Sequence, residues 1–281
     1  MRAEETPETS LTAPNGVGQP PDALLRSAGN LLAVLACFSV RMPSWTLTEL
    51  SREAGLPKST VFRILATLEA HNFLLRDEQT GAYRPTMRLW EIGAAALVVN
   101  GLHEAAHRFL PRLSERTGET AYATILDGRD AVHVDVYVAR SPVRLHADVG
   151  DRFPAHTVAS GKVLLAALPD DAVEAYIHGG LPEYTDRTLT DPQGLRDELA
   201  QVRRQGYALN RGERQHYVVG AGAPVRDHSG AVIAAIAAAG PSIRVTDDVH
   251  AVGRVVREVA DEMSLSLGCS PQLLGNRDIE P

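Results

Sequence analysis

The chain has 281 residues, of which 44% are hydrophobic and 22% charged, with a formal net charge of −7. This length suits two domains, and the composition is that of a globular protein. The negative charge argues against a protein that coats nucleic acid non-specifically. Two cysteines far apart in the sequence are too few for a disulfide framework or a zinc site.

Residues 1–21 are rich in Pro and Thr and poor in apolar side chains, which predicts a disordered tail. This segment lacks the apolar core of a signal peptide. No later stretch reaches the roughly 20 apolar residues that a membrane span requires. We therefore expect a cytoplasmic protein with no membrane partner.

Residues 22–85 have the pattern of a winged helix-turn-helix, a DNA-binding unit. Apolar side chains at helical spacing predict a first helix within 22–39. Thr46 and Glu49 have the spacing of a capping box at the start of the next helix. Gly55 supplies the permissive backbone that the sharp turn between two helices requires.

The helix after this turn, predicted over 58–70, is the expected recognition helix. Its polar face carries short donors and one arginine, the side-chain types that contact phosphates and base edges. A predicted hairpin follows, with an arginine on each side of a Gly-containing tip, as in a wing. This domain has seven Lys or Arg and six Asp or Glu, so it is nearly neutral. The prediction of DNA binding therefore depends on the helix-turn-helix pattern and not on the net charge. The predicted DNA-binding residues are Lys58, Ser59, Thr60, Arg63, Thr67, Arg76 and Arg84.

Residues 86–101 predict a helix too apolar to stand alone in water, which suits a linker and dimerisation surface. Leu89 and Ile92 are the expected helix–helix contacts. One winged helix covers too few base pairs for specific binding. We therefore expect a homodimer or homotetramer on a near-palindromic double-stranded DNA operator.

The segment 102–268 predicts a separate α+β domain with an antiparallel sheet, followed by a C-terminal tail over 269–281. A helix is expected first, then strands, then helices, then strands again, and a closing amphipathic helix. The predicted helices are 102–117, 156–168, 170–178, 191–205 and 246–266. The predicted strands are 119–126, 131–139, 142–149, 206–211, 217–226 and 231–239.

The alternative function is a metal-dependent or hydrolytic enzyme fused to a DNA-binding domain. His133, Asp135 and His146 form a candidate metal cluster, because His133 and Asp135 would share one face of a strand. The sequence has no nucleophile elbow, no His-Glu-x-x-His motif and no Walker A loop. We therefore expect no enzyme, no catalytic residue, no cofactor and no bound metal.

Several motifs in sequence order resemble the isocitrate lyase regulator (IclR) family of bacterial transcription factors, over roughly 24–267. The segments that carry the resemblance are 47–69, 117–120, 159–166, 204–208, 223–227 and 240–241. The resemblance implies an N-terminal winged helix-turn-helix, a linker helix and a C-terminal GAF-like effector-binding domain. It also implies dimers or dimers of dimers, and a small organic acid or aromatic catabolite as effector.

Family members that bind small oxo-acids hold them with an Asp, a Cys and two serines. At the matching positions this chain has Asn210, Gly220, Ala237 and Ala239, which give a roomier and less polar pocket. We expect an organic acid larger than glyoxylate or pyruvate, with an aromatic acid as one candidate, because Tyr122 and Tyr137 on the nearby strands suit flat groups.

The acid's carboxylate is expected at the helix start near 157–161, where backbone N–H groups and the helix dipole favour an anion. The alternative is that Ser160 and Gly161 only permit close helix–sheet packing. The sequence leaves open whether the effector releases or recruits the protein. The predicted effector-binding residues are Tyr122, Thr157, Ser160, Gly161, Asn210, Gly220, Ala237 and Ala239.

Overall fold

The structure is a computed structural model that describes residues 25–39, 41–98, 101–245 and 249–274. The predicted tail over 1–21 lies outside the described residues. Within the described part of the chain, no helix is both long and apolar enough to cross a membrane.

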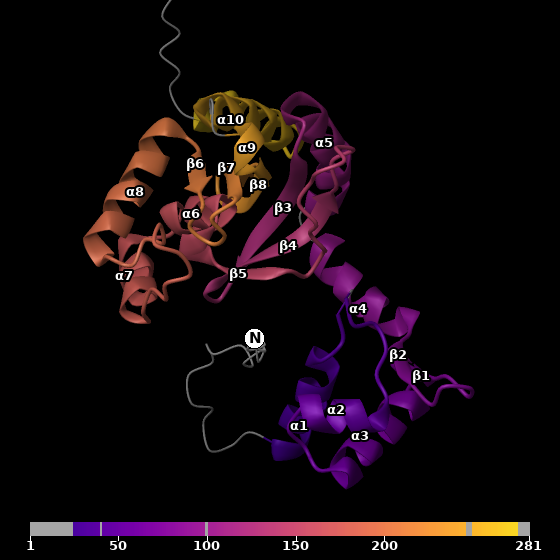
Figure 1. Cartoon of the computed structure of the whole chain (residues 1–281). Helices are drawn as coiled ribbons and strands as arrows, with labels where there is room; N and C mark the ends of the chain where they lie inside the picture. Colours follow the sequence, from indigo (N-terminus) through magenta and orange to yellow (C-terminus); the bar gives the residue numbers. More distant parts are fainter. Residues whose placement is uncertain (1–24, 40, 99–100, 246–248, 275–281) are drawn as a thin grey trace, which may run out of the picture.

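The N-terminal part forms three helices and a two-stranded hairpin, as the sequence predicted (Figure 1). Thr46 and Glu49 form the predicted capping box: each side chain bonds the backbone N–H of the other residue. Gly55 adopts a positive φ of 64° in the turn. The elements are α1 (Arg26–Ala36), α2 (Leu47–Glu53), α3 (Lys58–Ala70), β1 (Leu74–Arg76) and β2 (Tyr83–Pro85).

Trp45 joins the end of α1 to the hairpin. Its backbone exchanges two hydrogen bonds with Tyr83 of β2, at 3.0 and 2.7 Å. Its indole Nε1 donates to the carbonyl oxygen of Cys37 at 2.9 Å. Because Trp45 and Tyr83 are both buried among the leucines of α2 and α3, the hairpin is fixed relative to α3.

Helix α4 (Met87–Val98) leads from the hairpin to the C-terminal part (Figure 1). Leu89 is half-buried against the N-terminal core. Its role as a helix–helix contact stays a prediction. Ile92 is 56% exposed, and Met87 and Trp90 are exposed too. These three side chains are exposed apolar groups in the described part of α4.

The C-terminal part is an antiparallel six-stranded sheet between helices, which confirms the predicted α+β class (Figure 1). The strand order is β5-β4-β3-β8-β7-β6. Its strands are β3 (Thr120–Asp127), β4 (Asp130–Tyr137), β5 (Arg152–Pro154), β6 (Ala208–Arg211), β7 (Val218–Arg226) and β8 (Val232–Pro241). Its helices are α5 (Leu102–Thr117), η1 (Ala155–Thr157), α6 (Ala159–Ala166), α7 (Asp170–His178), α8 (Pro192–Gln205), α9 (Ser242–Val245), α10 (Val249–Ser266) and η3 (Pro271–Leu274).

The two faces of the sheet pack against different helices. Along β8, Ile236 and Ala238 face a core formed with α5 and α10. Ala235 faces a second core with α6, α7 and α8, while Ala237 lies in a small cluster with Tyr122 on the same side. Side chains along β8 therefore alternate between two faces of the sheet. One face is packed along its whole length, and the other is packed near Ala235 and borders a cavity near Ala237.

The segment predicted as a strand over 142–149 is not a strand. Pro142 has no N–H to donate, and the chain first bonds to β4 at Gly150 and Asp151, directly before β5. Thr120 holds this segment instead: its hydroxyl donates to the carbonyl oxygen of Leu145 at 3.1 Å and accepts from the backbone N–H of Ala139 at 3.2 Å. The segment is thus a loop laid across the open face of the sheet.

Helix α6 approaches η1 and the sheet at backbone contact distance. A Cβ at Gly161 would lie 2.5 Å from the Cα of Ala155 and closer still to its carbonyl oxygen. A Cβ at Gly222 of β7 would lie 2.9 Å from the backbone N of Ser160. Both glycines permit this approach, which brings the start of α6 over the strands.

The contact at Gly161 predicts a large effect of a single methyl group. Gly161→Ala is expected to lower the free energy of unfolding by about 1–3 kcal/mol, because the clashing atoms are backbone and have nowhere to move. Gly194→Ala in α8 is the matched control, since its nearest neighbour would be at 3.4 Å and the helix gains propensity. Urea unfolding of both variants measures the difference, and equal stability would contradict this packing.

Candidate DNA-binding face and ligand cavity

Helix α3 divides into the two faces that the sequence predicted. Its buried face consists of Val61, Ile64, Leu65 and Leu68. On the opposite side, Lys58, Ser59, Arg63 and Thr67 are exposed and Thr60 is half-buried. Phe62, 54% exposed beside Arg63, was not predicted as a contact. An exposed aromatic next to an arginine suits the methyl group of thymine and the acceptors of guanine.

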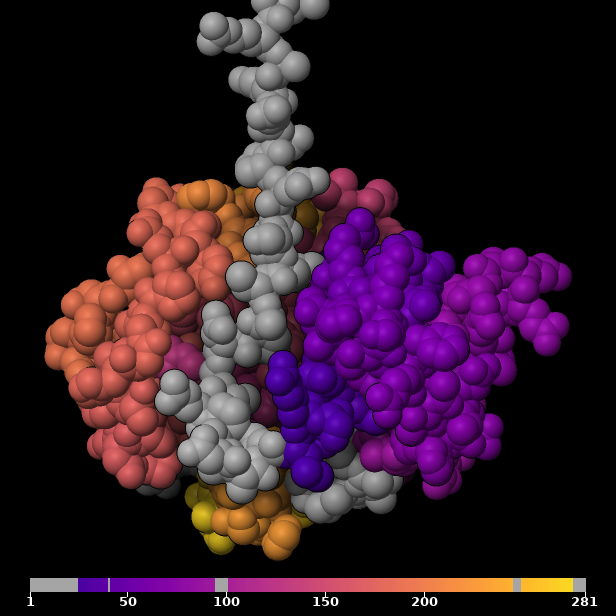
Figure 2. Space-filling model, turned by 90° about the horizontal axis from the view of Figure 1, so that it is seen from below, coloured from indigo at the N-terminus to yellow at the C-terminus, as the bar shows by residue number. Residues whose placement is uncertain are grey.

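The hairpin projects from the body of the domain as a wing (Figures 1 and 2). Its tip is held by Asp77, whose carboxylate accepts the backbone N–H groups of Gln79 and Thr80 at 2.9 and 2.8 Å. Arg76 and Arg84 are exposed on the two strands, and the Arg76 guanidinium lies 5.9 Å from the ring of Tyr83. The wing therefore presents two cations beside the exposed face of α3.

A cavity of about 630 Å³ lies in the C-terminal domain, between the sheet, the start of α6 and the loop that precedes β5. Small side chains of β7 and β8 form its floor. This volume is in the range that holds a drug-sized ligand. Its lining includes Tyr122, His133, Leu145, Ala147, Asp151, Phe153, Val158, Ser160, Asn210, Arg214, Val218, Gly220, Ala237 and Ala239.

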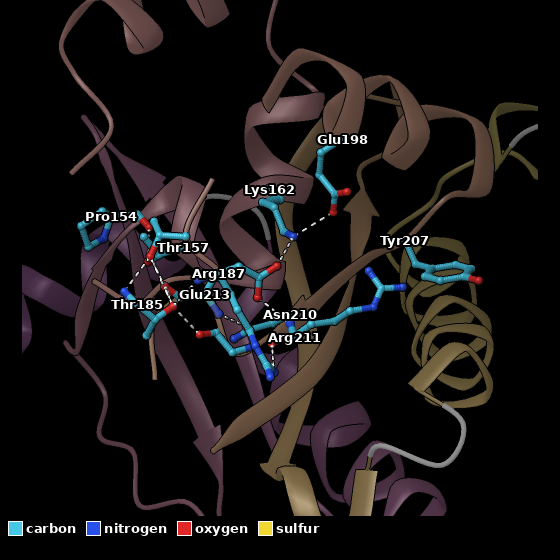
Figure 3. A network of polar contacts seen from close by, with 12 residues as sticks. Pro154, Thr157, Lys162, Thr185, Arg187, Glu198, Tyr207, Asn210, Arg211 and Glu213 are labelled. Carbon is cyan, nitrogen blue, oxygen red and sulfur yellow. Dashed lines mark hydrogen bonds and ion pairs between the residues drawn. The ribbon is translucent and has the colours of Figure 1, made fainter. Parts of the chain in front are cut away.

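Six of the eight predicted effector residues lie on this cavity: Tyr122, Ser160, Asn210, Gly220, Ala237 and Ala239. Thr157 and Gly161 do not. The hydroxyl of Thr157 is buried and donates to the carbonyl oxygen of Pro154 at 2.8 Å (Figure 3). Gly161 faces Ala155 and permits the close packing of α6 on η1, as the alternative interpretation of this residue predicted. Tyr137 packs on the opposite side of the sheet, against α5 and α10.

One wall of the cavity is aromatic and uncharged. The rings of Tyr122 and His133 stack with centroids 4.6 Å apart and planes 15° apart. Burial lowers the pKa of His133 to about 4, and burial raises the pKa of the Tyr122 phenol. His133 Nδ1 and the hydroxyl of Thr124 share a hydrogen bond of 3.1 Å. At neutral pH this wall is uncharged and suits a flat ring.

His133 and Asp135 do not share one face of β4, contrary to our prediction. The pairing of β4 with β3 shifts between His133 and Asp135, where Val134 has no partner. Such a bulge adds one residue and reverses the side-chain alternation. Asp135 therefore points toward His103 and His107 of α5. No three His, Cys, Asp or Glu side chains in the described ranges are placed to hold a metal ion.

A buried polar network supports the cavity rim (Figure 3). The ammonium of Lys162, with its side chain 1% exposed, pairs with Glu198 of α8 at 2.8 Å and with Glu213 at 2.9 Å. The other carboxylate oxygen of Glu213 accepts the backbone N–H of Arg211 at 2.5 Å. The side-chain oxygen of Asn210 accepts the N–H groups of Gly212 and Glu213 at 3.0 and 3.1 Å. Asn210 thus directs its acceptor into the loop and not toward the cavity.

The N-terminal domain touches the cavity mouth. Arg41, from the loop after α1, pairs with Asp148 and Asp151 of the loop before β5, both at 3.0 Å. Ser39 and Met42 line the cavity beside Arg41. Figure 2 shows the indigo and purple N-terminal domain beside the pink and orange elements of the C-terminal domain. One loop therefore closes the cavity and also contacts the DNA-binding domain.

The sequence did not reveal three of these features: the contact of Arg41, the aromatic partner His133 and the cation Arg214. Each depends on which loops meet in space. The short segment 212–216 between two predicted strands was one indication of Arg214, because loops at the end of a sheet are a common place for a binding residue.

Two family matches cover most of the chain. Residues 94–265 match the bacterial transcriptional regulator IclR C-terminal domain, and residues 27–78 match the IclR helix-turn-helix domain.

Three proteins illustrate the similarity. The HTH-type transcriptional regulator XynR of Escherichia coli K12 is 33% identical over 225 residues, which are 80% of this chain and 89% of XynR. The HTH-type transcriptional repressor AllR of the same strain is 33% identical over 242 residues, 84% of this chain and 88% of AllR. An IclR homologue from Microbacterium hydrocarbonoxydans, crystallised with 4-hydroxybenzoate, superposes with a TM-score of 0.77 at 28% identity, covering 86% of this chain and 98% of that one.

Proposed function

This chain belongs to the IclR family of bacterial transcriptional regulators, and we propose that an aromatic or similarly large organic acid in its C-terminal cavity controls how it binds an operator. It combines a winged helix-turn-helix with a ligand-binding domain of GAF-like fold. The observation that supports the proposal best is the cavity itself: its mouth is formed by the loop that also pairs with Arg41 of the DNA-binding domain.

The proposed effector class follows from the shape and polarity of the cavity. Gly220, Ala237 and Ala239 leave a wide floor with no side-chain hydrogen bond to offer. Stacked Tyr122 and His133 supply a flat and uncharged wall. A two- or three-carbon oxo-acid would leave most of about 630 Å³ unfilled. The homologue that holds 4-hydroxybenzoate has the same fold, which supports an aromatic acid here.

We propose that the protein acts as a cytoplasmic homodimer or homotetramer and not as an enzyme. The exposed apolar face of α4, with Trp90 and Ile92, supports pairing of linker helices. Pairing places two winged helices on one near-palindromic site. Like the relative AllR, which is a transcriptional repressor, it is proposed to occupy its operator in the absence of its effector.

Occupancy of the cavity is proposed to reach the operator by two routes. One is α4, which connects the domains in sequence. The other is the pair of contacts from Arg41 to Asp148 and Asp151, on the loop that an effector would displace. An effector that fits one arrangement of this loop better shifts the population between operator-competent and incompetent dimers.

Placement of α3 on DNA predicts different effects for two cations on its exposed face. Arg63→Ala is expected to cost about 1–3 kcal/mol on the cognate operator and to relax sequence preference, because Arg63 contacts a base edge. Lys58→Ala, nearer the phosphates, is expected to weaken all sequences alike and to lower the salt slope by about one. Arg204→Ala, on the exposed side of α8, is the control. Titrations with operator and with unrelated DNA at several salt concentrations measure these affinities. Equal losses of affinity in Arg63→Ala and Lys58→Ala, whatever the DNA sequence, would contradict the assignment of Arg63 to a base edge.

Filling the cavity floor predicts loss of effector binding without loss of operator binding. Ala239→Leu places a larger side chain among Gly220 and Tyr122, whereas the operator surface lies in the other domain. Ala239→Ser is the matched control, because it adds a hydroxyl with little volume. Calorimetry with aromatic and small aliphatic acids measures binding. Binding of two- or three-carbon oxo-acids alone, or an unchanged response in Ala239→Leu, would refute this cavity as the effector site.

A further inference from the structure

Arg214 lies on the wall of the cavity with its charge uncompensated. It follows Glu213 in the loop between β6 and β7. Its Nε is buried, and among the described residues this atom donates to no acceptor. A buried donor without an acceptor destabilises the protein, and more so when the group is charged. An acceptor supplied by a ligand would remove that cost.

The other arginines of the cavity already have carboxylate partners. Arg41 pairs with Asp148 and Asp151, and Arg152 pairs with Asp127 and Asp130. Arg214 makes no ion pair with any described residue. The neighbouring Glu213 does not compensate it, because both of its carboxylate oxygens are engaged, one by Lys162 and one by a backbone N–H.

A stack on Tyr184 orients the Arg214 guanidinium. Its central carbon lies 4.0 Å from the ring centroid of Tyr184. Stacking uses the flat face of a guanidinium and leaves its N–H groups, which lie in the plane, free to donate. A carboxylate can then accept two parallel hydrogen bonds from Nε and one terminal nitrogen. Lysine offers no such planar fork.

The backbone before Arg214 is held in one conformation (Figure 3). Thr185 donates to the carbonyl oxygen of Gly212 at 2.8 Å, and Thr188 donates to that of Glu213 at 2.7 Å. Gly212 has a φ of 99°, a conformation that favours glycine. Together with the Lys162 network, these bonds fix the loop, so little ordering is required when a ligand binds Arg214.

The neutral residue at position 210 completes the site. Asn210 lines the cavity, carries no charge and uses its side-chain oxygen to bind the loop, so it does not compete with a ligand for Arg214. We propose that Arg214 binds the carboxylate of the effector through a two-bond fork, with the acid's body against Tyr122 and the small residues of β7 and β8. This inference rests on the proposed function and names the residue that recognises its acid group.

The test compares aromatic acids with their neutral amides on the full-length protein. Calorimetry with benzoate, 4-hydroxybenzoate and phenylacetate, each beside its amide, is carried out on wild type and on Arg214→Gln. The affinity of Arg214→Gln for the acids is expected to fall by about 10- to 100-fold, with less than about a 3-fold change for the amides. Arg214→Lys is expected to be intermediate, because it keeps the charge without the fork.

Arg211→Gln is the matched control, at the end of β6 next to the same loop and with the same change of charge. Its guanidinium reaches away from the cavity to His250, at 3.2 Å (Figure 3). Thermal unfolding checks that all variants are folded. Equal losses for acid and amide, or unchanged acid affinity in both Arg214 variants, would overturn the inference while the proposed function stands. If none of these acids binds wild type, the proposed aromatic acid and this inference both fall.

Discussion

The architecture of the cavity depends on the ion pairs of the buried Lys162 ammonium. Lys162 lies on α6, pairs with Glu198 on α8, and pairs with Glu213 in the loop between β6 and β7. A charge in so dry a place is stable only with its partners, and loss of one partner of such a pair costs about 3–5 kcal/mol. The ion pairs therefore tie together the helix whose start lies over the cavity and the loop that presents Arg214.

The second constraint is the small size of the side chains beneath that helix. Gly222 and Gly161 let α6 approach the strands and η1 at backbone distance, while Gly220, Ala237 and Ala239 leave space farther along the same strands. One face of the sheet is thus packed at one end and open at the other. Gly220, Ala237 and Ala239 widen the cavity, and the neutral Asn210 adds no negative charge beside Arg214.

Local patterns predicted the winged helix well, because caps, turns and amphipathic spacing act over a few residues. Thr46, Glu49 and Gly55 occupy the predicted places for that reason. Most strands and helices of the second domain were predicted too. The failures depend on long-range pairing: the loop over 142–149 lacks a strand partner, and one bulge moved Asp135 to the other face of β4. The position of Arg214 on the cavity depends on how distant loops meet in space, and the spacing of apolar residues in the sequence does not predict that.

Signal transmission requires that the cavity and the operator surface share a movable element. Arg41 and its two aspartates form an exposed contact, and such surface pairs contribute about 0–1 kcal/mol, so an effector can displace it readily. The most direct test measures operator affinity with and without a saturating acid, and acid affinity with and without operator, in wild type and Arg41→Gln. We predict that each ligand weakens the other by the same factor, about 5- to 150-fold, and that Arg41→Gln reduces that factor. Operator affinity that is unchanged by a bound acid would contradict the account.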